Sequence, residues 1–119
     1  MQSILAISIS LFSLLSPVLG TPGNVFVCTG SNWSNTCEVL TLGIDGACTR
    51  LPSTYDGHIG SAGPDPGAIC RLFTNGDCTG HGVAILYNPG DSNLYNSVNG
   101  IDAGHQAHYI QCRSCTACT

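Results

Sequence analysis

The chain has 119 residues, a formal net charge of −4, and only 8% charged residues. It contains three basic residues, Arg50, Arg71 and Arg113, which do not cluster in the sequence. This distribution argues against a nucleic-acid surface and against attraction to anionic lipid. The length is typical of one domain, and 15 glycines and 6 prolines leave little room for long helices.

The first residues have the layout of a signal peptide. A short polar start precedes an apolar run over 4–19, and small or neutral residues precede a cleavage point before Thr21. The run is shorter than the roughly 20 residues that span a bilayer, which disfavours a membrane anchor. We therefore predict a signal peptide over 1–20, a single domain over 21–119, and a secreted, extracellular protein.

All eight cysteines follow this leader. In a short secreted chain, such a density indicates a disulfide framework formed in an oxidising compartment. We predict that every cysteine is paired, although many pairings are possible. One interpretation joins Cys37 to Cys48 and ties the C-terminal cysteines to the body of the domain. The predicted disulfide residues are Cys28, Cys37, Cys48, Cys70, Cys78, Cys112, Cys115 and Cys118.

Five short segments are rich in apolar or β-branched residues, which is typical of strands. In chain order they cover 25–28, 37–42, 68–73, 83–87 and 108–112. Clusters of Gly, Asn, Asp and Pro separate them, and these residues favour turns. Short strands with such turns predict an antiparallel sandwich or barrel.

A weak internal repeat divides the domain into two units. In each unit a residue on a strand is followed seven positions later by a residue suited to a folded turn, and later by a serine. Glycine at the turn permits a backbone conformation that other residues resist, and the serine hydroxyl can tie the hairpin to a neighbouring strand. The pattern predicts two Greek-key motifs and eight strands in two packed sheets. The residues are Cys28, Asn35 and Ser61 in the first unit, and Phe73, Gly80 and Ser97 in the second.

On these residues the chain resembles the βγ-crystallin-like Greek-key family, in particular its small cysteine-rich secreted fungal members. The resemblance places motif one at about 24–63, motif two at about 67–112, and a cysteine-rich tail at 112–119. It implies an all-β, disulfide-stabilised antiparallel β-sandwich. The group includes structural, calcium-binding and toxin-like proteins, so the resemblance implies no single function.

The calcium-binding members have an Asx-Asx-x-x-Ser/Thr-Ser stretch near each motif end, because calcium takes several oxygen ligands. The corresponding stretches here are 56–61 and 92–97. The first keeps Asp56 but lacks the second Asx, and the second has no carboxylate. We therefore predict no metal site and no cofactor.

The histidines are the candidates for zinc binding or acid–base chemistry. His105 and His108 precede three cysteines, but those cysteines are expected in disulfides, and on a strand the two histidines would point to opposite faces. His58 or His81 with Glu38 would supply an acid–base pair for RNA cleavage, although no spacing supports that pairing. No nucleophile elbow is present. We predict no catalytic residues.

Two neighbouring residues in a predicted turn are further candidates. Asn32 begins an Asn-Trp-Ser sequon and is a glycosylation candidate. Trp33 is either a ligand-stacking residue or an aromatic that packs at the hinge of the hairpin.

The leader, the cysteines and the lack of a catalytic set predict a protein that acts by binding. The resemblance adds the expectation of a fungal effector or toxin-like virulence protein, monomeric and acting on a protein or cell-wall target outside the producing cell. No nucleic-acid binding and no membrane insertion are expected. Two alternatives stay open, a structural or cell-wall-associated secreted protein and a small secreted ribonuclease-like hydrolase.

Overall fold

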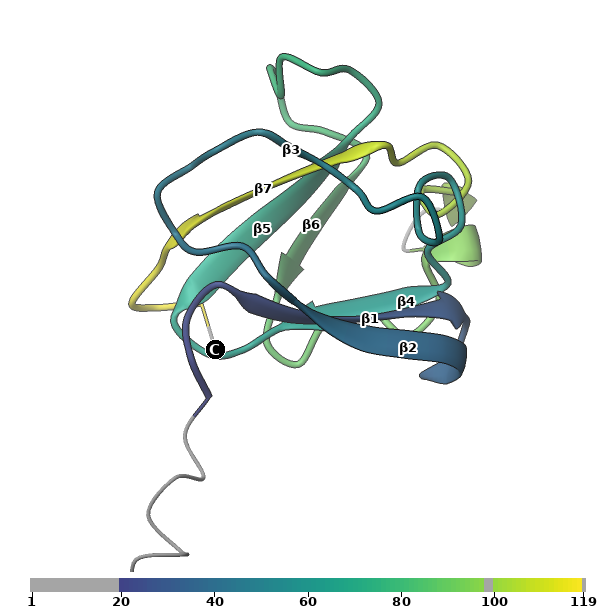
Figure 1. Cartoon of the computed structure of the whole chain (residues 1–119), viewed down its shortest axis with the longest axis horizontal. Coiled ribbons are helices and arrows are strands. Elements are labelled where there is room, and N and C mark those ends of the chain that lie inside the picture. The colour runs from purple at the N-terminus through teal and green to yellow at the C-terminus, as the bar shows by residue number, and fades with distance from the viewer. Residues whose placement is uncertain (1–19, 98–99, 119) are drawn as a thin grey trace, which may run out of the picture.

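The computed structural model describes residues 20–97 and 100–118. The predicted signal peptide lies outside these residues except for Gly20. In the described part, seven strands form two antiparallel sheets that pack against each other, and one short 3-10 helix lies in a connection (Figure 1). No helix of this part is long and apolar enough to cross a membrane.

The first sheet has three strands in the order β2-β1-β4. They are β1 (Asn24–Gly30), β2 (Ser34–Thr41) and β4 (Ser61–Pro64). β1 is central, and its alternate residues Val25 and Val27 are fully buried. Beyond β4, Ala62 and Asp91 form an isolated antiparallel bridge where a fourth strand would pair.

The second sheet has four strands in the order β3-β7-β5-β6. They are β3 (Thr49–Arg50), β5 (Ala68–Phe73), β6 (Ala84–Tyr87) and β7 (Tyr109–Ser114), and the 3-10 helix η1 (Leu94–Asn96) lies between β6 and β7 in the chain. Alternation again selects the inward residues, since Leu72, Leu86 and Ile110 are buried. They pack with residues of the first sheet in a single core.

The motifs exchange strands, as a pair of Greek keys requires. β3 follows the first motif's hairpin but pairs with β7 in the second sheet. Asp91 follows the second motif's hairpin but forms its bridge with Ala62 of β4 in the first sheet. The predicted eighth strand is therefore a single bridge in the described residues. The surrounding Asn-Pro-Gly-Asp sequence explains this, because proline donates no backbone hydrogen bond and these residues favour turns.

The first motif has the folded hairpin that the repeat predicts. Asn35 takes the glycine-like conformation with φ 68°. Ser61 is fully buried, and its Oγ donates to the Gly30 carbonyl at 2.8 Å and accepts from the Trp33 amide at 3.1 Å. This serine thus joins β4 to both ends of the β1–β2 turn.

The second motif differs in its serine. Gly80 has the positive φ that the motif requires, 81°. Ser97, however, donates its Oγ hydrogen bond to Asp91 Oδ2 at 2.5 Å and does not bond to the β5–β6 connection. The second motif therefore lacks the serine hydrogen bond to its own hairpin that the first motif has.

Four disulfides connect the cysteines in a pattern that corrects the predicted Cys37–Cys48 pair. Cys37 bonds to Cys28 on the neighbouring strand, because β1 and β2 place these residues directly opposite each other. The other bonds are Cys48–Cys78, Cys70–Cys112 and Cys115–Cys118. The tail is consequently held by Cys112 within β7, and the last two cysteines close a local loop.

Candidate interaction surface

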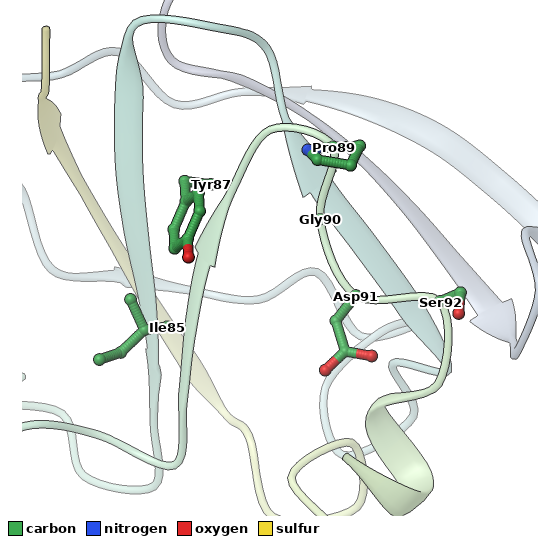
Figure 2. Close-up of a pocket in the computed structure, with 6 residues that line it drawn as sticks. All are labelled: Ile85, Tyr87, Pro89, Gly90, Asp91 and Ser92. Atoms are coloured by element: carbon green, nitrogen blue, oxygen red, sulfur yellow. The ribbon is translucent and has the colours of Figure 1, made fainter. Parts of the chain in front are cut away.

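A line of hollows runs along β6 and past the β1–β2 turn. Its middle part has a volume of about 430 Å³ and lies between β6 and the segment 89–92 (Figure 2). A hollow on each side shares residues with it, Pro89 at one end and Ile85 at the other. We refer to this continuous depression, from Trp33 through Pro89, Tyr87 and Ile85 to Ile101, as the β6 groove.

The groove exposes large apolar side chains. Ile85 and Tyr87 are 47% and 50% exposed, since they occupy the outward positions of β6. At the far end, Phe26 and Trp33 stack with their ring centroids 6.0 Å apart, and each is about 40% exposed. Neighbouring apolar side chains left in water on one small domain are typical of an interaction site.

Asp91 supplies a fixed polar group in the groove. Its Oδ1 accepts from the Asn93 amide at 2.8 Å and its Oδ2 accepts from Ser97 Oγ at 2.5 Å. Its backbone is bridged to Ala62, so the residue is held from both sides. The lining contains a second carboxylate, that of Asp65, and neither lysine nor arginine, which gives the groove a negative character.

β6 is a short end strand that carries neither a charged residue nor a proline. It pairs only with β5, so its other edge has no strand partner among the described residues. Natural sheets shield such edges with charged side chains, proline or bulges. The stretch 83–88 contains no charged residue and no proline, and the next proline is Pro89. Two of the four β6 residues, Ile85 and Tyr87, are apolar and strongly exposed. The strand is therefore suited to adding an extended partner segment.

A polar cluster on another side of the domain joins three segments. Asp56 Oδ2 accepts from Arg50 Nε at 2.8 Å, while its Oδ1 bonds to Nδ1 of His108. Arg50 also donates to the Tyr109 hydroxyl at 3.2 Å and lies over that ring. The bond to His108, with a smaller contribution from Arg50, lowers the pKa of Asp56 below its usual 3.8.

We expect Asp56→Asn to destabilise the protein at pH 7 by about 1 kcal/mol, because a half-exposed charged network is lost. Since the folded-state pKa of Asp56 is lowered, its contribution is complete above pH 3.8 and disappears as the pH falls through the folded-state pKa. Urea unfolding from pH 2 to pH 7 measures this. An equal difference between variant and parent at every pH would contradict it.

The histidines that were the candidates for zinc binding or acid–base chemistry make other contacts. His105 bonds to Asp102 at 2.7 Å and stacks on Tyr95, and His108 bonds to Asp56. Neither lies on a strand, which corrects the expectation that they project from opposite faces of one. The described residues include no group of His, Cys, Asp and Glu arranged to hold a metal ion.

The acid–base pair considered for the ribonuclease alternative is not assembled in the described part of the chain. Glu38 is exposed on β2 of the first sheet, and no hydrogen bond or ion pair joins it to His58 or His81. His58 instead lies edge-on to His105, with ring centroids 6.2 Å apart. Asn32 is exposed in the β1–β2 turn, where its glycosylation stays a prediction.

The two stretches that correspond to the calcium motif do not fit the ion. In the first, both oxygens of Asp56 are already bonded, one to His108 and the other to Arg50. In the second, 92–97, there is no carboxylate, and the adjacent Asp91 bonds to Ser97. A calcium ion needs several oxygens free of protein partners at close range.

Sequence reasoning missed the groove apart from Trp33. The strand at 84–87 reads as a continuous apolar run, so its pattern predicts burial on both faces, yet Ile85 and Tyr87 face solvent. The only signal was the absence of any charged residue from that strand. Phe26 gave no signal, since it sits in an apolar run as well.

Comparison with solved structures bears on this architecture. The chain is similar to the crystal structure of a βγ-crystallin domain of Abundant Perithecial Protein from Neurospora crassa in the Ca²⁺-bound form. The TM-score is 0.54 at 12% sequence identity, and the match covers 80% of this chain and 92% of that chain. No protein-family model and no curated protein matches the sequence.

The protein therefore has a βγ-crystallin-like fold, stabilised by four disulfides, as the sequence pattern predicted. This fold fits a small non-enzymatic protein. Several disulfides in so short a chain are typical of extracellular proteins.

Proposed function

We propose that the protein is secreted and acts as an effector or toxin-like binding protein outside the cell that produces it, with the β6 groove docking a target protein. The observation that carries this proposal is the apolar edge strand β6 beside a groove of exposed aromatic side chains. The disulfides support it, because they favour persistence in an oxidising, protease-containing environment.

The groove favours an extended peptide segment as its occupant. A segment that adds to a sheet edge gains backbone hydrogen bonds from the strand, and its alternate side chains enter pockets along it. Ile85 and Tyr87 would contact those side chains. Because the lining carries two carboxylates and neither lysine nor arginine, a neutral or positively charged segment suits it.

The test uses the mature chain, residues 21–119, applied to plant tissue and to competing microbes. We expect a measurable response that Ile85→Ser/Tyr87→Ser reduces by about tenfold, since interface aromatics commonly dominate binding. Val39→Ser is the matched control, because Val39 is 53% exposed on β2 and does not line the groove. All variants are first checked for unchanged thermal unfolding.

Two results would overturn the proposal. One is an inactive mature chain in every assay, together with its absence from the culture filtrate of the producing organism. The other is a groove variant as active as the Val39→Ser control. Expression confined to spores or to one growth stage would instead favour the structural alternative.

The similar Neurospora domain was solved in the Ca²⁺-bound form, whereas both oxygens of Asp56 here already have protein partners and 92–97 has no carboxylate, so we expect a different behaviour. Millimolar calcium should leave the thermal midpoint of the mature chain unchanged within about 1 °C, because a ligand stabilises only the state that binds it. A thermal scan with calcium and with a chelator measures this. A calcium-dependent rise of several degrees would show that a site exists.

A further inference from the structure

The outer face of the second sheet gathers the basic residues that the sequence scatters. Arg50 lies on β3, Arg71 on β5 and Arg113 on β7. All three alternate with the buried residues Leu72, Ile110 and Cys112, so they project away from the core. These are the only lysine or arginine residues in the sequence, so every permanent positive side-chain charge lies on one face.

The strand register places two of these arginines close together. Arg71 is opposite Gln111, and Arg113 is opposite Ile69, so the two arginines are diagonal neighbours on adjacent strands. Diagonal neighbours in a sheet have Cα atoms about 7–8 Å apart. Gln111 lies between them and donates to the Gly46 carbonyl at 2.9 Å, which leaves its side-chain oxygen available to accept a hydrogen bond.

Arg113 is also held in place. A Cβ built on Gly46 would fall 2.6 Å from Arg113 Nη1, which means that the guanidinium rests directly on the backbone of this turn. Gly46 is tied to β7 through its amide, which donates to the Cys112 carbonyl at 3.0 Å. A guanidinium ordered in advance loses less freedom when it binds an anion.

The negative groups near this face leave two guanidiniums without an ion pair. Asp56 is bonded to Arg50 at 2.7 Å, so that arginine is compensated. Asp45 is bridged to Arg113 through the backbone, but its carboxylate accepts from the Ala47 amide. Within the described ranges, neither Arg71 nor Arg113 has a carboxylate within ion-pair distance.

We propose that Arg71, Gln111 and Arg113 form a binding site for a carboxylate-bearing polysaccharide, a polymer of uronic acid. Arginine binds carboxylates through two parallel hydrogen bonds, and Gln111 offers an acceptor for a sugar hydroxyl between the two charges. An exposed sheet face suits an extended chain. Arg71 Nη1 donates to the His81 carbonyl at 3.4 Å, which leaves the other N–H groups of this guanidinium for a ligand. Nucleic acid is disfavoured because two cations without an ion pair, in a chain of net charge −4, neutralise few phosphates.

This site is distinct from the β6 groove, although it adjoins it at Ile85, which is opposite Arg71. A polymer bound by Arg71, Gln111 and Arg113 would leave the groove free for another partner. The inference does not depend on the proposed effector role.

The experiment measures binding of the mature chain to polygalacturonate by calorimetry or affinity electrophoresis. A fully methyl-esterified form of the polymer has the same sugar chain without the charge. We expect binding to the charged form that weakens as salt rises. Arg71→Gln/Arg113→Gln should weaken it by about tenfold, since each exposed ion pair contributes a few-fold.

Three further variants make the result specific. Thr36→Glu/Val39→Glu changes the net charge by the same two units on β2 of the other sheet and should bind within about twofold of the parent. Arg71→Lys/Arg113→Lys keeps the charge but loses the paired hydrogen bonds, so intermediate binding is expected. Ile85→Ser/Tyr87→Ser should bind the polymer like the parent, which separates this site from the groove.

The proposal is overturned if the charged and esterified polymers bind equally, or if the β2 variant loses as much affinity as the arginine variant. It is also overturned if polyglutamate or single-stranded RNA binds more tightly than polygalacturonate at equal charge concentration, since the face would then be a site for a different polyanion. Unfolding of each variant in urea identifies any loss of fold.

Discussion

Replacing Cys70 and Cys112 with alanine lowers the free energy of unfolding by about 4 kcal/mol. The two residues are 42 positions apart, and a cross-link that closes a longer loop removes more disorder from the unfolded chain. Both sulfurs are also buried in the core, between the two sheets. Urea unfolding of the oxidised protein measures the change, and the thermal midpoint should fall by roughly 20 °C in a domain of this size.

The pair Cys28 and Cys37 provides the graded control. It closes a loop with a separation of 9, so the same relation predicts a loss of about 3 kcal/mol for its removal. The order of the two variants is therefore a test in itself. If removing the shorter loop cost more than removing the longer one, chain entropy would not be the dominant contribution of these bonds.

Replacing Ser61 with alanine costs about 2 kcal/mol, because two backbone groups of the first hairpin lose their partner in a buried place. The Gly30 carbonyl and the Trp33 amide both bond to this hydroxyl. The change removes one oxygen atom and no apolar contact. Urea unfolding measures the stability, and hydrogen exchange of the Trp33 amide measures the local effect, which should be faster in the variant.

Ser97→Ala is the matched substitution in the second motif. Ser97 is only half-buried, and its partner Asp91 also accepts from the Asn93 amide. A loss below about 1 kcal/mol is therefore expected. Equal losses at Ser61 and Ser97 would mean that both serines tie their hairpins in the same way, contrary to the hydrogen bonds described.

Five strands, β1, β2, β5, β6 and β7, were predictable because each contains several apolar or β-branched residues. The segment 68–73 was predicted with the bounds that the structure has, and the others differ at their ends. β3 and β4 were missed. β3 has only two residues, and β4, Ser61–Pro64, contains no large apolar residue and is buried by its neighbours. Such strands form because a partner strand pairs with them, and the residues within the strand itself do not indicate which segment that partner is.

The pairing of the cysteines also could not be predicted from local sequence. The number of disulfides was predictable from the even count of cysteines in a short chain. The partner of Cys37 depended on the register of β1 against β2, which places it opposite Cys28, whereas the predicted partner Cys48 bonds to Cys78. Strand register also places Cys70 opposite Cys112, so pairing between strands decided these two bonds.

The sequence by itself indicated a disulfide-stabilised all-β fold with two related motifs, because cysteine count, turn residues and strand patterns are local properties. Only the tertiary structure decided which residues share a surface. It brought Arg71 and Arg113 onto one face and left Ile85 and Tyr87 exposed beside an unpaired edge. The physical reason is that strand order and register set these neighbours, and both depend on pairings between distant parts of the chain.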